Sequence, residues 1–353
     1  MKIHIVGAGL IGTSIGLALK QHGDTVTFAD TNVEHLQFAR DLVGVPSEVG
    51  NPSLVIVATP PAGVFSALKE QFTINPQAMF IEISGLKSEL LRQVEELPEL
   101  SRRFCGTHPM AGRELSGPTA ARADLFQGAT WIITPTALTD NEVLAAAKNL
   151  ALELGSVVRV VGANKHDELI SGVSHLPQAV STILARTLST KSEEELGLAG
   201  QGLRDLTRLA DSNPKLWADL LIRNRSNVIQ DLRKVASEIE GMLAHLESEN
   251  ESALEEFIRD GGAAKSRIPG KHGGKSREYV YLPIVIEDKA GQLAAIFDEC
   301  AAAEVNVEDL FIEHSPGQET GLITLALSQD DANILRPHLV EKNWRVHGIR
   351  ANR

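Results

Sequence analysis

The sequence predicts an α/β fold with a doubly wound sheet, followed by an all-helical domain and a small C-terminal domain. Three observations lead to this prediction. Short apolar runs alternate with helix-like segments over residues 1–162, helical periodicity alone continues over 163–260, and strand-like runs return over 279–353. The first pattern is typical of a Rossmann-like sheet, and the last has the βαββαβ order of ferredoxin-like domains.

The first strand leads directly into a glycine fingerprint. An apolar run at residues 1–6 is followed by Gly-Ala-Gly-Leu-Ile-Gly. Gly7 allows a tight turn, Gly9 lets a pyrophosphate approach the backbone, and Gly12 lets the next helix pack close to the strand. The N-terminus of that helix offers N–H groups to phosphates. The residues expected to line the cofactor here are Gly7, Gly9, Leu10, Ile11 and Gly12.

The second strand, at residues 25–29, ends in Asp30. An acidic residue about twenty positions after the glycines can accept hydrogen bonds from both ribose hydroxyls and would repel a 2′-phosphate. Thr31 and Asn32 supply no arginine that could hold such a phosphate. The sequence therefore predicts NAD rather than NADP, with Thr59 as a further cofactor-binding residue.

Four more apolar runs are expected to complete the sheet as buried strands of the parallel type: Leu54–Ala58, Ala78–Ile83, Trp131–Thr134 and Val157–Val161. Helical spacing over Asp167–Leu188 and Lys215–Leu246 predicts the helical domain. A helical domain this small often completes its core with a second copy, so we expect a homodimer.

Composition limits the class of protein. The net charge of −12 argues against nucleic acid as the main partner. No apolar run is long enough to span a bilayer, and the N-terminus has no basic flank typical of a signal peptide. Cys105 and Cys300 are far apart, which implies neither a disulfide framework nor a metal site. A cytoplasmic protein without a membrane partner is expected.

The glycine-rich, basic segment 261–278 is interpreted as a linker, although its five cations also resemble a nucleic-acid-binding arm.

A histidine stands where the substrate crevice of such a fold should be. The stretch GTHPMAGRELSGPTAARADLFQG, residues 106–128, contains His108 directly after a predicted strand that ends at Thr107. Ligands of open α/β sheets bind at the carboxyl ends of the strands. A histidine there can take a proton near neutral pH while a hydride leaves for a nicotinamide, although a histidine at a strand end can also be purely structural.

Four motifs together carry a resemblance. GAGLIG, GTHPMAG, KHDELISGVSHLP and RDLTRLADSNPKLW, in this order and spacing, resemble the prephenate/arogenate dehydrogenase family of tyrosine biosynthesis over residues 1–260. The resemblance implies an NAD-dependent oxidative decarboxylation. Removal of a hydride from C4 of prephenate turns that carbon into a carbonyl, and loss of CO₂ makes the ring aromatic. The product is 4-hydroxyphenylpyruvate, and arogenate would give tyrosine directly.

The resemblance also implies roles for individual residues. His108 would hydrogen-bond the C4 hydroxyl, and Arg208 would hold a substrate carboxylate through its planar guanidinium. Ser174 would lie near the nicotinamide and the substrate. Trp217 matches a tryptophan near the pocket, although packing explains it equally well.

Two positions depart from the family pattern. Ser84-Gly85-Leu86-Lys87 replaces the common Gly-Ser-Val-Lys, which displaces the catalytic serine candidate, Ser84, by one residue. Gln178 stands where some prephenate-using members have a second histidine, so a possible cation near the substrate side chain is missing. Gln178 stays among the predicted substrate-binding residues, and prephenate is placed before arogenate.

The tail resembles an ACT domain, a module that often binds amino acids. We expect tyrosine to bind near the turn formed by Asp288, Gly291 and Leu293 and to inhibit the enzyme, or the tail to serve only in oligomerisation. Two other readings stay open for the whole chain. One is a different NAD-dependent reductase, such as a β-hydroxyacid dehydrogenase or an imino-acid reductase. The other is a non-catalytic sensor of NAD and amino acids.

Overall fold

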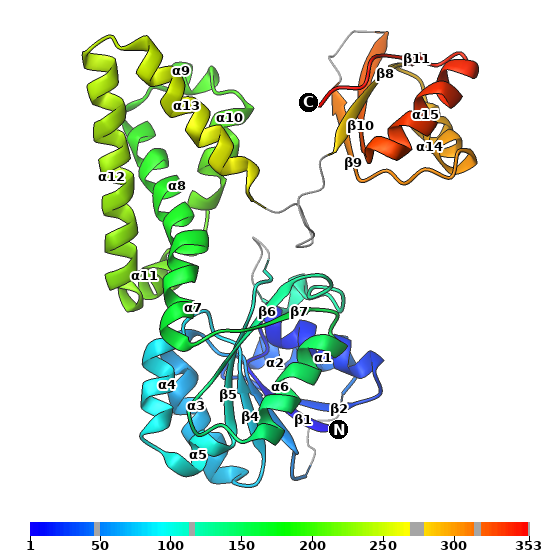
Figure 1. Ribbon diagram of the computed structural model, residues 1–353. Coiled ribbons are helices and arrows are strands. Elements are labelled where there is room, and N and C mark those ends of the chain that lie inside the picture. The colour runs from blue at the N-terminus through cyan, green and yellow to red at the C-terminus, as the bar shows by residue number, and fades with distance from the viewer. Residues whose placement is uncertain (46–49, 113–116, 269–278, 314–318, 352–353) are drawn as a thin grey trace. The chain divides into compact units, whose positions relative to one another are not determined.

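The computed structural model describes residues 1–45, 50–112, 117–268, 279–313 and 319–351. The chain forms two compact units, Met1–Arg259 and Asp260–Arg353 (Figure 1). Residues 113–116 of the histidine-containing stretch and residues 269–278 of the predicted linker lie outside the described residues.

The first unit contains a seven-stranded sheet in the order β2-β1-β3-β4-β5-β6-β7. Its strands are β1 (Lys2–Val6), β2 (Thr25–Ala29), β3 (Leu54–Val57), β4 (Met79–Glu82), β5 (Phe104–Pro109), β6 (Thr130–Pro135) and β7 (Val157–Val160). Strands β1 to β5 are parallel, which confirms the predicted sheet for this part of the chain.

The last two strands correct the expectation of a wholly parallel sheet. Strand β6 pairs antiparallel with β5, and β7 runs parallel to β6. A parallel neighbour of β5 would need a long crossover, usually a helix. The described part of the connection between β5 and β6 contains the 3₁₀ turn Pro118–Ala120 and further turns but no α-helix, and the chain returns antiparallel.

Both faces of the sheet are covered by helices, as expected for a doubly wound fold (Figure 1). Because side chains alternate along a strand, Leu54 and Ile56 of β3 join one apolar cluster while Val55 and Val57 join another. The first cluster includes residues of α1 (Leu10–Gln21), α2 (Val33–Val43) and α6 (Asn141–Glu153). The second includes residues of α3 (Pro61–Ile74), α4 (Ser88–Glu95) and α5 (Pro98–Arg102).

Helices follow the sheet, as predicted. They are α7 (Ala163–Ile170), α8 (Leu176–Thr187), α9 (Glu193–Gly197), α10 (Gln201–Thr207), α11 (Pro214–Arg223), α12 (Arg225–Glu247) and α13 (Glu251–Ser266). The predicted helix over Lys215–Leu246 is interrupted at Asn224, and α13 continues beyond residue 260, so the segment predicted as a linker begins as helix.

A π-helical turn, Ser171–His175, joins α7 to α8. Pro177 follows it and has no backbone N–H, and its ring would clash with the carbonyl four residues earlier in a regular α-helix. A locally wider turn removes this conflict. Such turns are frequent at functional sites, and this one contains Ser174.

Within the described residues, no helix is both long and apolar enough to cross a membrane.

The second unit contains a four-stranded antiparallel sheet in the order β11-β8-β10-β9. Its elements are β8 (Val280–Glu287), α14 (Gln292–Ala302), β9 (Asp309–Glu313), β10 (Thr320–Leu327), α15 (Gln329–Glu341) and β11 (Arg345–Val346). They follow the predicted order, and the sheet and the two helices enclose a separate apolar core.

Candidate active site

The glycine fingerprint forms the turn between β1 and α1. Gly7 has a φ of +110°, and a Cβ there would lie 2.4 Å from the Ala58 carbonyl oxygen. A Cβ on Gly12 would lie 2.0 Å from the Gly7 carbonyl oxygen, whereas one on Gly9 would meet no described atom within 4 Å. Gly7 and Gly12 are therefore required by the protein's own packing, and the space above Gly9 is open for a ligand.

Asp30 follows β2 and stands beside this turn. Its Oδ2 accepts a hydrogen bond from the Ala8 N–H at 2.6 Å, and its Oδ1 accepts one from the Asn32 N–H at 2.7 Å. Each carboxylate oxygen keeps a second lone pair for a ribose hydroxyl. The Thr59 hydroxyl, just after β3, is buried and has no hydrogen-bond partner in the described part of the chain. These features fit a bound dinucleotide.

His108 lies near the carboxyl end of β5 and belongs to a row of side chains connected by hydrogen bonds. Its Nδ1 lies 2.9 Å from Nε2 of His166, and Nδ1 of His166 lies 2.8 Å from Oδ1 of Asp167. His166 and Asp167 are consecutive residues of α7, 58 and 59 positions further along the chain. The fold therefore connects the end of the sheet to the first helix after it.

These hydrogen bonds fix the proton positions on the two rings when both rings are neutral. The pKa of Asp167 is lowered: burial raises it, but the hydrogen bonds from His166 and from the Ser88 and Lys87 amides outweigh burial. The ionised carboxylate can only accept, so Nδ1 of His166 carries a proton and its Nε2 is an acceptor in the neutral ring. Nδ1 of His108 must then donate. Neutral His108 consequently has an unprotonated Nε2.

Asp167 is itself held by the start of α4. Its Oδ1 accepts from the Lys87 N–H at 2.9 Å, and its Oδ2 accepts from the Ser88 N–H at 2.8 Å. The N-cap residue of that helix, Lys87, makes no side-chain cap of its own. A carboxylate at a helix N-terminus also interacts favourably with the helix dipole.

The surroundings keep His108 uncharged. Burial is the largest cause that lowers its pKa well below the ordinary histidine value, followed by the positive charge of Lys87. Lys87 is completely buried and forms an ion pair with the equally buried Glu82 of β4. Burial also lowers the pKa of Lys87, and Glu82 opposes this effect. A buried cation held by the loop after β4 thus contributes to the field at His108.

The hydroxyl of the displaced serine, Ser84, lies beside this ion pair. The Ser84 hydroxyl donates to the Leu86 carbonyl at 3.1 Å and accepts from the Lys87 ammonium at 3.4 Å. Gly85 is the residue that lies beside the base, because a Cβ there would be 3.7 Å from Nε2 of His108.

A second set of contacting side chains surrounds His175, and the π-helical turn places this histidine against α11. The rings of His175 and Trp217 meet edge to face, with centroids 5.9 Å apart and planes at 89°. Asn224 Nδ2 donates to the Asp167 carbonyl at 2.8 Å and lies 3.1 Å from His175 Nδ1. Asp167 therefore connects both groups.

Gln178 is buried on α8, and its amide donates to the Leu209 carbonyl at 2.7 Å. This contact fastens the exposed Arg208, the preceding residue in the 3₁₀ turn Arg208–Ala210, to the start of α8. Ser174 is half-buried in the π-helical turn. Contacts thus join Gln178 to the arginine's turn and Trp217 to His175.

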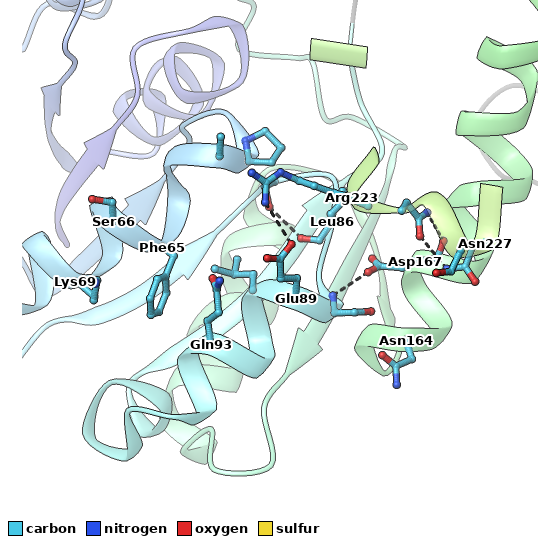
Figure 2. Close-up of a pocket in the computed structure, with 17 residues that line it drawn as sticks. Phe65, Ser66, Lys69, Leu86, Glu89, Gln93, Asn164, Asp167, Arg223 and Asn227 are labelled. Carbon is cyan, nitrogen blue, oxygen red and sulfur yellow. Dashed lines mark hydrogen bonds and ion pairs between the residues drawn. The ribbon is translucent and has the colours of Figure 1, made fainter. Parts of the chain in front are cut away.

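A polar pocket of about 650 Å³ lies between α3, α4 and the starts of α7 and α12, and Figure 2 shows the side chains that line it. Phe65 and Lys69 of α3 lie across from Asp167 and Asn227. Arg223 pairs with Glu89 of α4 at 3.3 Å. The pocket is bordered by Ser84, Asp167 and Asn224, so it adjoins the polar network around His108.

The sequence motifs gave no role to six residues of this network: Glu82, Lys87, His166, Asp167, His175 and Asn224. The dipeptide His-Asp stood in a quoted motif, and Glu82 is a charged residue at the end of an apolar strand. That charge was the one available signal, because a strand covered on both faces seldom carries a carboxylate unless it is paired.

Comparison with known proteins agrees with these features. Residues 15–160 match the family model described as the nucleotide-binding domain of prephenate dehydrogenase, and residues 162–260 match the model of its dimerization domain.

Three individual proteins show the extent of the similarity. Probable prephenate dehydrogenase NovF of Streptomyces niveus is 30% identical and is matched over 96% of this chain and 98% of its own length. Prephenate dehydrogenase of Bacillus subtilis (strain 168) is 26% identical, over 93% of this chain and 92% of its own. A crystal structure of prephenate dehydrogenase from A. aeolicus, in complex with hydroxyphenyl propionate and NAD⁺, is 28% identical with a TM-score of 0.71. It covers 76% of this chain and 99% of that chain. The chain belongs to the prephenate dehydrogenase family.

Proposed function

We propose that this protein is an NAD-dependent prephenate dehydrogenase that forms 4-hydroxyphenylpyruvate. The observation that carries the proposal is the His108–His166–Asp167 chain, which leaves Nε2 of a neutral His108 free to accept a proton. A base of this kind at the carboxyl end of β5 suits the oxidation of an alcohol beside a nicotinamide.

The proton balance of the reaction fits a half-buried histidine. Nε2 of His108 takes the proton of the C4 hydroxyl as the carbonyl forms. A bound NAD⁺ would supply the acceptor for the hydride that leaves C4. The bond from C1 to the carboxylate then breaks, its electron pair enters the ring, and the phenol oxygen takes a proton back. The same Nε2 can return that proton, so the reaction needs no net proton release.

His166 and Asp167 support this step without touching the substrate. When Nε2 of His108 is protonated, the ring becomes a cation, and the carboxylate of Asp167 stabilises it through His166. Lys87 acts in the opposite direction and keeps the proton from being held too firmly. A base with a low pKa returns its proton readily, which aromatisation of the ring requires.

Arg208 is proposed to hold a substrate carboxylate, with Ser174 and Trp217 lining the same crevice. Gln178 supports this proposal, because its buried amide ties the Arg208 turn to α8. Gln178 is therefore proposed to act on the substrate through the position of Arg208. Ser84 is proposed to support the Glu82–Lys87 pair.

NAD is the cofactor that suits this chain. Gly7, Gly9 and Gly12 form the phosphate turn, the buried Thr59 hydroxyl lacks a partner among the described residues, and Asp30 stands where it would repel a 2′-phosphate. Leu10 and Ile11, at the start of α1, complete the proposed cofactor site.

Steady-state NADH formation with prephenate and with arogenate, each with NAD⁺ and NADP⁺, tests this function. The proposal predicts a large preference for prephenate with NAD⁺. A preference for arogenate would retain the role of His108 but make the protein an arogenate dehydrogenase. Turnover of neither substrate would refute the proposed function and favour a non-catalytic sensor.

A homodimer is proposed on two grounds. Residues 162–260 match a dimerization domain. The helices after the sheet also expose large apolar side chains, among them Ile183, Leu206, Ile239, Leu246 and Ile258. Monomers seldom leave so many large apolar residues exposed on one set of helices.

The tail is proposed to be an ACT-type, ferredoxin-like domain that binds tyrosine as a feedback inhibitor. Its strand order and its two helices support the fold. Gly291, with a φ of +92°, precedes α14, and Leu293 is 40% exposed, so the turn after Asp288 presents a glycine and an apolar side chain to a ligand. Removal of residues 279–353 should abolish inhibition by tyrosine while turnover remains. Equal inhibition of the truncated enzyme would rule out this role.

A further inference from the structure

We propose that Asn224 is a positioning residue that holds His175 in its uncharged form, with the ring proton on Nε2 and none on Nδ1. Its link to turnover rests on the proposed function, but the protonation state of His175 does not. Neither residue was singled out for this purpose by the motifs of the sequence.

The orientation of the Asn224 amide is fixed by three contacts. The amide nitrogen, Nδ2, lies 2.8 Å from the Asp167 carbonyl oxygen, and that oxygen can only accept a hydrogen bond. Oδ1 accepts from the side-chain amide of Asn227 at 2.8 Å. The atom that lies 3.1 Å from His175 Nδ1 is therefore an N–H donor. A donor at this place requires an unprotonated Nδ1.

The position of Asn224 in the chain supports a specific role. It stands between α11 and α12, where asparagine ordinarily uses its side chain to cap the following helix. The Asn224 side chain makes no such cap and turns inward, where the residue is only 5% exposed. The Asn224 amide therefore contacts residues of the site, and α12 has no side-chain cap from it.

The charges around His175 agree with a neutral ring. Burial lowers the pKa of His175 to about 4, Asp167 raises it and His166 lowers it, while Trp217 presents an uncharged ring from α11. A positive charge on His175 would also lower the pKa of His108. Burial and the Asn224 donor together keep His175 uncharged, so His175 adds no cation beside the base.

Asn224→Asp is the informative variant because it preserves size and replaces the donor by an acceptor. A carboxylate at this position favours a proton on Nδ1 of His175, so the pKa of His175 should rise by about 2 units or more. The titration can be followed by NMR of ring-labelled histidine in the full chain. In this variant kcat/KM should fall about tenfold as the pH drops below the raised pKa of His175, with unchanged NAD⁺ affinity, and the wild type should show no such fall over the same range.

Asn141→Asp is the matched control. Asn141 is exposed at the start of α6 and lies outside the pocket, so the variant adds the same charge at a helix N-terminus without replacing a donor to His175. It should leave both the His175 titration and the turnover close to those of the wild type.

The wild-type protein gives a test that needs no variant. The ¹⁵N shifts of His175 should show a protonated Nε2 and an unprotonated Nδ1 at pH 7, whereas the reverse pattern would overturn the inference. An unchanged His175 titration in folded Asn224→Asp would also overturn it, even if activity were lost. Lack of turnover in the wild type would count against the proposed function and would leave the NMR test of Asn224 decisive.

Discussion

The two compact units differ in what they bury. Met1–Arg259 encloses a set of ionisable and amide side chains beneath its candidate site: Glu82, Lys87, His166, Asp167, His175, Gln178 and Asn224. In the described part of Asp260–Arg353, the buried side chains are apolar apart from the hydroxyl of Thr324. Both units have a complete apolar core.

The difference shows that the first unit buries polar groups for catalysis at a cost in folding free energy. Burying a charge or an amide is unfavourable unless each polar atom is paired, and apolar packing alone can maintain a fold. The first unit keeps its polar groups paired and thereby fixes the proton positions on His108. The second unit shows no such network among its described residues, which suits a domain that binds a ligand at its surface and catalyses nothing.

The largest effect should come from breaking the buried ion pair. Lys87→Met leaves the Glu82 carboxylate buried without its partner, so the free energy of unfolding of the first unit should fall by about 3–5 kcal/mol. Chemical denaturation followed by the fluorescence of Trp131 and Trp217 measures it. The double variant Glu82→Gln, Lys87→Met should recover much of this loss. Equal loss in both variants would show that the pair itself is not the cause.

Removal of the base should have the next largest effect. His108→Asn keeps a polar side chain but removes Nε2, and turnover should fall about a hundredfold or more while NAD⁺ affinity is preserved. His22→Asn, an exposed change outside the site, is the control. Unchanged turnover in His108→Asn would remove His108 from the mechanism.

Acid should destabilise the first unit more than the tail. His175 has a folded pKa of about 4, below its unfolded value near 6.5. As the pH falls between these values, the unfolded chain binds a proton that the folded chain does not. Stability is therefore lost on acidification, by up to about 3 kcal/mol at pH 4 for this one group. Denaturation monitored separately through Trp217 and Trp344 measures the difference, and equal losses in the two units would contradict the comparison.

A smaller effect is expected from changing Asp167, the carboxylate that orients His166 and, through it, His108. Asp167→Asn retains one acceptor for His166, but its new NH₂ group faces the Ser88 N–H. Turnover should fall about tenfold, and the lost helix cap should reduce stability by about 1 kcal/mol. Kinetics at several pH values measure the first effect. Wild-type kinetics in this variant would show that the carboxylate does not support the base.

The smallest effect belongs to the tail. Thr324→Val replaces the one buried hydroxyl noted there by a methyl group of similar size, and stability should change by less than about 1 kcal/mol with unchanged turnover. A loss as large as that of Lys87→Met would mean that the tail also depends on a buried polar group.

The sequence predicted much of this arrangement. The fingerprint, Asp30 and the order of the tail's elements follow from local patterns of glycine, charge and hydrophobic periodicity. The position of His108 at a strand end follows from the same patterns. Local patterns could not show that His166 reaches His108, because a His-Asp pair on a helix usually faces solvent and the contact joins residues 58 positions apart.

The direction of β6 and the break at Asn224 were missed for related reasons. Apolar periodicity does not distinguish a parallel from an antiparallel strand, and the connection between β5 and β6 gives no periodic signal that would decide it. The break between α11 and α12 lies inside a continuous helical pattern, at Asn224, whose amide turns inward and donates to the Asp167 carbonyl.

The buried network should make His108 a neutral base with an unprotonated Nε2. The ¹⁵N NMR spectrum of His108 at pH 7, assigned by its loss in His108→Asn, tests this most directly. We expect a protonated Nδ1 and an unprotonated Nε2. A proton on Nε2, or a doubly protonated ring, would contradict it.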